Sequence, residues 1–255
     1  MNLYNSVRVN LQTGLIDGHV HLSEMEHPGR AVENAFRAGV KRMVAVAMNL
    51  DSCRKTLTLA DKFPDTVLPA IGYHPWSIKA EDVEDTINFI TKNIQRCIAI
   101  GEVGLDYKVK VKKKLQKAVF SKLLNLSVKY NKPVIIHSRF SHQRTYEMAV
   151  KAGVEKVVFH WYSGPVDILD NIIASGYHIS ATPALAYSPQ HQAAMERAPV
   201  EKILIETDAP VQYGDRSSEP ADLHETLLHL SRIKEMPADK LAEIVTKNTE
   251  RFFGL

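Results

Sequence analysis

Residues 97–139 read CIAIGEVGLDYKVKVKKKLQKAVFSKLLNLSVKYNKPVIIHSR, and this stretch contains one complete structural unit. It begins with an apolar run, Cys97–Val103, and ends with a second one, Pro133–His137. Between them, apolar residues recur every three or four positions across Lys112–Lys129, as in an amphipathic helix. Because both runs are continuously apolar rather than alternating, they predict strands that are buried on both faces. A parallel sheet covered by helices has such strands.

The same pattern occurs along the whole chain. Eight apolar runs predict strands: Leu15–Leu22, Arg42–Ala47, Val67–Tyr73, Cys97–Val103, Pro133–His137, Lys156–Trp161, Tyr177–Ala181 and Ile203–Asp208. Helical patterns cover Asp51–Lys62, Glu81–Asn93, Lys112–Lys129, His142–Lys151, Pro220–Arg232 and Pro237–Phe253. These strands and helices follow one another without a linker or low-complexity segment. The order predicts an α/β fold, a (β/α)8 TIM-type barrel. We expect this barrel to be a single domain over residues 1–255, with an extra C-terminal helix at about 237–253. A doubly wound open sheet is the alternative; no GxGxxG turn follows the first run, which weakens its nucleotide-binding version.

Composition sets broad limits on function. The chain has 255 residues, 45% hydrophobic and 24% charged, which fits one barrel as well as two smaller domains. A net charge of +3 names no partner by itself. Cys53 and Cys97 form no CxxC pair and indicate a reducing compartment. The polar N-terminal stretch has no signal core, and no run reaches the roughly 18 apolar residues of a membrane span, so we expect a cytoplasmic protein without membrane contact.

Metal-ligand residue types gather at the ends of the predicted strands. The first run contains His19 and His21, which point to the same side of a strand and could hold one ion. Such a pair alone is weak evidence, but later runs carry four more candidates, Glu102, His137, His160 and Asp208. A single polar residue at a strand end could be a satisfied core group. Six at the face where barrel enzymes build active sites predict a hydrolase. Four imidazoles and two carboxylates exceed the needs of one four-coordinate ion, which favours two divalent ions.

Several segments of the chain resemble the TatD-type metal-dependent DNases of the amidohydrolase superfamily. The similarity runs in order from about residue 15 to the C-terminus. It is carried by His19-Val20-His21, Tyr73-His74-Pro75, Gly101-Glu102-Val103-Gly104-Leu105-Asp106-Tyr107, Ile136-His137-Ser138-Arg139, Glu206-Thr207-Asp208-Ala209-Pro210 and Glu219-Pro220-Ala221.

The resemblance implies a ligand set. It places His19, His21 and Asp208 on one ion, His137 and His160 on the other, and Glu102 between them. Relatives that hydrolyse amides or phosphotriesters often use a carbamylated lysine in the position of Glu102. The chain departs from the family pattern at Phe140, at Trp161-Tyr162, in the lysine-rich segment 108–114, and at Arg216-Ser217-Ser218, all of which bear on substrate contacts.

The predicted reaction is hydrolysis of a phosphodiester by a metal-activated water. Asp208 and Glu102 are the candidate catalytic residues, with Asp208 as general base or as metal ligand only. The resemblance implies DNA as substrate and 3′ to 5′ exonuclease action. Zn, Mn, Ni, Co or Mg could occupy such sites. Alternatives are a related amidohydrolase that acts on a C–N or ester bond of a small molecule, and a non-catalytic metal-binding barrel. No obligatory protein partner is inferred.

Substrate contacts are predicted with a structural alternative beside each. His74 could donate a hydrogen bond to a phosphate oxygen, or it could be held in its loop. Arg139 could clamp a phosphate or pair with an acid. The lysines of 108–114 could guide a polyanion or form a solvated face. Aromatic residues could stack on bases or pack inside: Trp76, Trp161 and Tyr162. The other histidines, His27, His142, His178, His191, His224 and His229, are expected at the surface or in the core.

Overall fold

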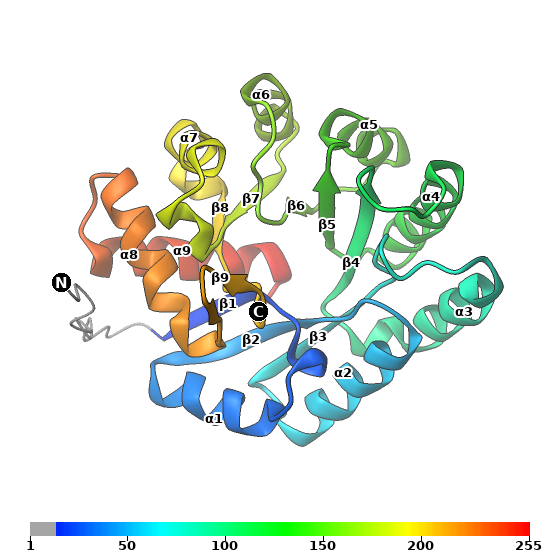
Figure 1. Ribbon diagram of the computed structural model, residues 1–255, viewed down its shortest axis with the longest axis horizontal. Helices are drawn as coiled ribbons and strands as arrows, with labels where there is room; N and C mark the ends of the chain where they lie inside the picture. The colour runs from blue at the N-terminus through cyan, green and yellow to red at the C-terminus, as the bar shows by residue number, and fades with distance from the viewer. Residues whose placement is uncertain (1–13) are drawn as a thin grey trace.

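The computed structural model of the protein describes residues 14–255, and in it eight parallel strands form one sheet in chain order (Figure 1). Residues 1–13, most of the polar N-terminal stretch, lie outside the described residues. The strands are β1 (Leu15–Val20), β2 (Val40–Val46), β3 (Val67–Ile71), β4 (Ala99–Asp106), β5 (Val134–Arg139), β6 (Val157–Phe159), β7 (His178–Ala181) and β8 (Ile203–Ile205). All eight coincide with predicted runs, so the barrel prediction is confirmed.

Helices alternate with the strands and surround the sheet (Figure 1). They are α1 (Pro28–Arg37), α2 (Leu50–Lys62), α3 (Val83–Asn93), α4 (Lys113–Tyr130), α5 (His142–Ala152), α6 (Val166–Ala174), α7 (Pro189–Arg197), α8 (Leu223–Ile233) and α9 (Ala238–Phe253). The sequence patterns did not include α1, α6 and α7. α1 begins with Pro28-Gly29, a dipeptide typical of turns, and α6 and α7 are nine residues each, too short for a clear period.

The ring closes where its first and last strands meet. Asp208 N donates to His19 O at 3.0 Å, and His21 N donates to Ala209 O at 2.8 Å. The hydroxyl of Thr207 donates to the buried carboxylate of Asp17 at 2.6 Å. These bonds form a seam between the end of β1 and residues 207–209, which follow β8.

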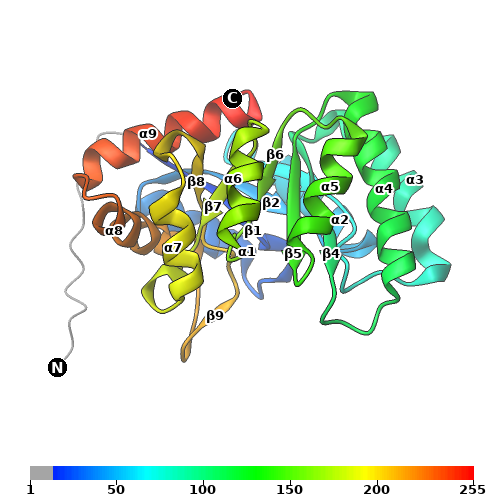
Figure 2. The same cartoon turned by 90° about the horizontal axis from the view of Figure 1, so that it is seen from above.

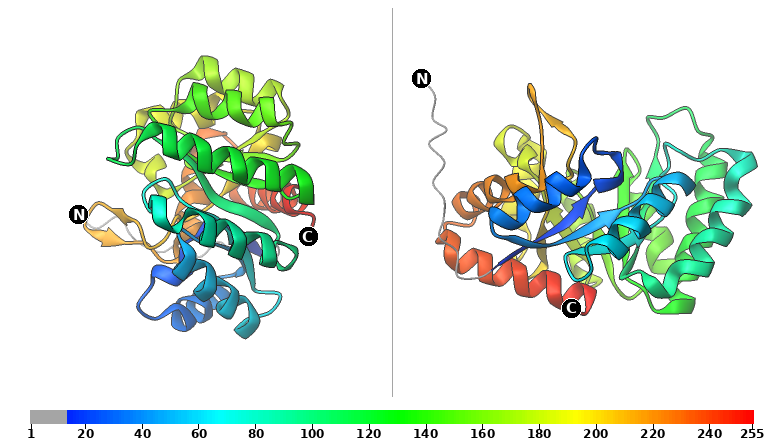
Figure 3. Two further views of the ribbon diagram at one scale, coloured as in Figure 1. Left: turned by 90° about the vertical axis from the view of Figure 1, so that its right-hand side faces the viewer. Right: turned by 90° about the horizontal axis from the view of Figure 1, so that it is seen from below.

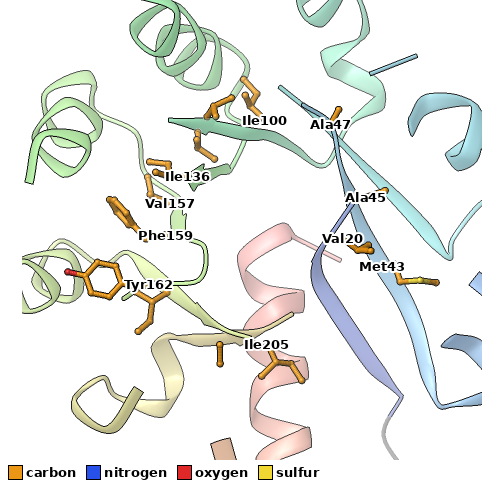
Figure 4. Packing of buried hydrophobic residues seen from close by; sticks show 14 of the residues in the cluster. Val20, Met43, Ala45, Ala47, Ile100, Ile136, Val157, Phe159, Tyr162 and Ile205 are labelled. Carbon is orange, nitrogen blue, oxygen red and sulfur yellow. The ribbon is translucent and has the colours of Figure 1, made fainter. Parts of the chain in front are cut away.

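Apolar side chains fill two layers, one inside the ring and one between the ring and its helices. Val44 and Val46 of β2 belong to the inner cluster, together with Phe252 and Phe253 of α9. Met43 and Ala45, which alternate with them, belong to the outer cluster. Figure 4 shows other members of the outer cluster, such as Val20, Ile136 and Ile205, on their strands. This alternation is the period of two expected for strands buried on both faces.

The two ends of the barrel differ. α9 runs along one end (Figures 2 and 3). Its Phe252 and Phe253 belong to the cluster inside the ring. From the other end projects a short hairpin of β9 (Gln212–Tyr213) and β10 (Arg216–Ser217) (Figures 2 and 3). That second end carries the carboxyl ends of the strands, which leaves it available for a site. Among the described residues, no helix is both long and apolar enough to traverse a bilayer.

Candidate metal centre

His19 and His21 lie at the carboxyl end of β1 with their rings turned toward each other. The period of two places both on the inner side, and their Nε2 atoms are 3.2 Å apart. Both residues are buried, and the Nδ1 atom of each has no hydrogen-bond partner among residues 14–255. The structure therefore directs two imidazole nitrogens at one point inside the barrel mouth.

Asp208 completes this first group from across the seam. Its Oδ1 atom lies 3.4 Å from Nε2 of both His19 and His21, yet it makes no hydrogen bond among the described residues. The φ angle of Asp208 is +52°, the left-handed region that few residues other than glycine adopt. A buried carboxylate oxygen without a donor is costly unless another group satisfies it.

Glu102 connects the first group to a second one. Its Oε2 atom lies 3.3 Å from Nε2 of both His19 and His21. Its Oε1 atom lies 2.9 Å from His137 Nδ1 and 2.9 Å from His160 Nε2. The pairing of β4 with β5 shifts register between Ile100 and Val103, at the position of Glu102. The six predicted ligand residues thus meet around one carboxylate.

The glycine at position 104 lets β4 and β5 approach closely beside this group. Its φ is +148°, and a Cβ atom there would lie 2.0 Å from the carbonyl oxygen of His137. No side chain fits in that space. Gly104 therefore helps to hold His137 against Glu102.

His74 and Arg139 have different positions. His74 is buried beside the centre: its Nε2 lies 3.2 Å from Glu102 Oε1, and its Nδ1 accepts a hydrogen bond from Trp76 N at 3.2 Å. Nε2 therefore carries the proton. Arg139, at the end of β5, is exposed, and its guanidinium makes no hydrogen bond or ion pair within residues 14–255. The structure brings His74 to the centre and leaves Arg139 at the rim.

Two further carboxylates, which the sequence reasoning missed, orient the histidines of the second group. Asp106 Oδ2 lies 3.1 Å from His137 Nε2 and accepts from the indole of Trp76 at 2.6 Å. Glu206 Oε1 lies 3.1 Å from His160 Nδ1. A signal was available, because Asp106 stands four positions after Glu102, and Glu206 two before Asp208, and even spacings share a face in a strand.

The pKa shifts of the buried carboxylates and imidazoles show which of them carry charge. Burial alone would raise the pKa of Glu102, but the imidazoles around it lower it well below its usual range. Burial would lower the pKa of His21, yet the neighbouring carboxylates of Asp208 and Glu102 outweigh it and raise this pKa to about 10. The pKa of His160 is likewise raised, because Glu102 outweighs the effect of burial. The acids are thus ionised, and bound protons or cations must neutralise them.

The donor atoms fit metal cations. One ligand atom from each of His19, His21 and Asp208 lies within 4.8 Å of the other two, and the same holds for His74, Glu102 and His137. Mixed imidazole and carboxylate sets suit Zn, Mn, Ni and Co. The Asp208 oxygen that lacks a donor is the observation that most directly calls for a cation.

The predicted substrate-contact residues divide into exposed and buried ones. Lys108, Lys110 and Lys112 are exposed in the loop after β4. Trp76 is 48% exposed, and Trp161 is partly buried. Tyr162 is buried, and its hydroxyl donates to Pro165 O, so the prediction that it stacks on a base is wrong. Tyr162 is a packing residue.

Known proteins resemble this chain in sequence and in fold. A sequence model of the family described as TatD-related DNase matches residues 16–254. An uncharacterized metal-dependent hydrolase of Methanocaldococcus jannaschii is 30% identical over 93% of this chain and 96% of its own. The human deoxyribonuclease TATDN3 is 28% identical over 94% of each chain. The crystal structure of a TatD homologue from Escherichia coli superposes with a TM-score of 0.86 at 23% identity, covering 94% of this chain and 98% of the other.

Proposed function

The chain belongs to the family of TatD-related DNases, and on that premise we propose that it is a deoxyribonuclease that removes nucleotides from the 3′ end of DNA. It is a metal-dependent hydrolase that acts on ester bonds. The observation that supports the proposal best is the arrangement around Glu102, whose two oxygens face two separate groups of imidazoles. Two cations side by side suit a phosphodiester, since both the attacking and the leaving oxygen need stabilisation.

We propose the ligand set that the family resemblance implies, and the distances are compatible with it. His19, His21 and Asp208 would hold one ion, His137 and His160 the other, and Glu102 would reach both. Asp106 and Glu206 would fix the rings of His137 and His160 by accepting from their far nitrogens. When bound, such ions lower the pKa of water toward neutrality and stabilise charge on phosphoryl oxygens.

The chain's own residues would then handle the proton and the substrate. Asp208 Oδ1 is free of hydrogen bonds among residues 14–255 and faces the centre, so it can accept the proton of the attacking water. His74 is neutral, because burial lowers its pKa to about 4, and it carries its proton on Nε2. It would donate to a non-bridging phosphate oxygen. Arg139, exposed at the rim, would contact a phosphate farther along the strand.

The test is cleavage of end-labelled DNA by purified protein with each divalent metal in turn, with and without a chelator. We expect a 3′ label to be released at once and a 5′ label to give a ladder of shortening products. The chelator should abolish both. His19→Ala should remove activity, while His27→Ala, which removes an exposed histidine, should not. A uniform loss of full-length DNA without a ladder would refute exonuclease action.

A further inference from the structure

Three aromatic rings form a continuous array at the end of the barrel that carries the metal centre. Trp161 follows β6, Tyr187 follows β7, and Tyr213 lies in the hairpin after β8. The ring centroids of Trp161 and Tyr213 are 5.5 Å apart, and those of Tyr213 and Tyr187 are 6.5 Å apart. Tyr187 is 56% exposed, so the array ends in a ring that is open to solvent.

The array is attached to the metal centre by hydrogen bonds. Trp161 comes directly after His160, and its backbone N donates to Glu206 Oε1 at 3.0 Å. The hydroxyl of Tyr213 donates a hydrogen bond to the carbonyl oxygen of Thr207 at 3.0 Å, and Thr207 directly precedes Asp208. The rings are therefore positioned by the same segments that position the candidate ligands.

The backbone at Trp161 shows that its ring is held in a defined place. Its φ is +43°, which is rare for a bulky residue, and its N also donates to Ser180 Oγ at 3.0 Å. A conformation of this kind costs free energy and persists only where the surroundings impose it. Here the two hydrogen bonds from Trp161 N, to Ser180 Oγ and to Glu206 Oε1, impose the conformation.

The opposite side of the opening is basic. The loop after β4 carries exposed Lys108, Lys110 and Lys112. β4 and β8 lie four strands apart in the eight-stranded ring, so this loop and the hairpin face each other across the centre. Figure 2 shows both at the same end of the barrel.

We propose that Trp161, Tyr213 and Tyr187 form a stacking subsite for the base at the 3′ end of a DNA strand, and that the strand leaves across the metal centre toward the lysines. The inference rests on the proposed nuclease function. Aromatic faces stack on any base, whereas the phosphates that follow need cationic partners. With the terminal base on this array, the first phosphate would lie toward the centre, because Trp161 directly follows His160 and Tyr213 bonds Thr207 beside Asp208.

The test measures binding and cleavage separately, with metal-loaded protein. Three short single-stranded oligonucleotides with a non-hydrolysable terminal linkage serve as probes: intact, abasic at the 3′-terminal nucleotide, and abasic at the 5′-terminal one. Dissociation constants come from fluorescence anisotropy. The variants are Tyr187→Ala, Tyr187→Phe and, as control, Phe36→Ala, whose ring is 51% exposed on α1. Cleavable oligonucleotides give kcat/KM.

We expect the wild type to bind the intact probe about tenfold more tightly than the 3′-abasic one, within the range for base–aromatic stacking. Tyr187→Ala should lose this preference, while Tyr187→Phe and Phe36→Ala should keep it. Equal binding by Tyr187→Ala and the wild type would overturn the subsite, as would an equal effect of the 5′-abasic position. If the wild type cleaves DNA but shows no preference, only the subsite is wrong. If it shows the preference but cleaves no DNA, only the nuclease proposal is wrong.

Discussion

Glu206 gives a sharp test of the metal centre, because a glutamine there would keep its contacts and lose only its charge. Oε1 of Glu206 accepts hydrogen bonds from His160 Nδ1 at 3.1 Å and from Trp161 N at 3.0 Å. A glutamine Oε1 can accept both hydrogen bonds. A hydrogen bond to a charged group contributes about 1.5–3 kcal/mol, and a neutral one about 0.5–1.5 kcal/mol. The difference of about 1–1.5 kcal/mol predicts that Glu206→Gln raises the dissociation constant of the ion on His160 about five- to tenfold. Loss of an outer partner of a metal ligand has effects of that order or larger.

The assay is a competition titration against a chromophoric chelator at fixed pH. Glu201→Gln is the matched control, because it removes the same charge at an exposed position near the opposite end of β8. We expect Glu201→Gln to match the wild type. If both variants bound metal like the wild type, Glu206 would not act on a metal ligand, and the assignment of His160 would fail with it.

Three other outcomes are expected. His19→Ala should lower the metal content from two ions per chain to one by elemental analysis, whereas His27→Ala should retain two; retention of two by both would refute the assignment. Phe252→Ala should lower the free energy of unfolding in urea by about 3–5 kcal/mol, because the ring of Phe252 is buried inside the barrel. The side chain of Phe140 is 69% exposed, so Phe140→Ala should change the free energy of unfolding by less than about 0.5 kcal/mol. His191 is buried, and its Nε2 accepts a hydrogen bond from Thr182 N. Burial lowers the pKa of His191 to about 4. The pKa of His191 is lower in the folded than in the unfolded protein, so the neutral ring contributes to the free energy of unfolding above about pH 6.5 and this contribution is lost as pH falls toward 4. The loss between pH 7 and pH 5 is about 2 kcal/mol. His191→Gln should show a shallower pH dependence of the urea midpoint, and an equal slope would contradict the reasoning.

The sequence predicted the barrel well because a parallel sheet buries both faces of each strand. The apolar runs that result are visible without knowledge of contacts, as Val134–Arg139 illustrates. Short helices without a clear pattern of apolar residues were missed, such as α7, which is nine residues long and largely polar. A helix is recognised in sequence by its length and by apolar residues that recur every three or four positions, and α7 offers neither clearly.

The six candidate ligand residues could be expected to lie together because they stand in or just after the carboxyl-terminal parts of parallel strands, which the barrel topology brings to one end. Asp106 and Glu206 were overlooked because their role depends on which nitrogen of His137 and His160 faces Glu102, and sequence does not fix ring orientation. Tyr187 and Tyr213 were out of reach for another reason. They lie in loops after different strands, and loop conformation sets their contact.

The seam between β1 and the segment after β8 has a consequence for the behaviour of the whole chain. His19 and Asp208 stand 189 positions apart in sequence, yet their side chains meet there. A cation shared by them would act as a removable cross-link between the first and last strands, and cross-links that close long loops restrict the unfolded chain most. Chelation should therefore speed amide hydrogen exchange at this seam, in β1 and in the segment after β8.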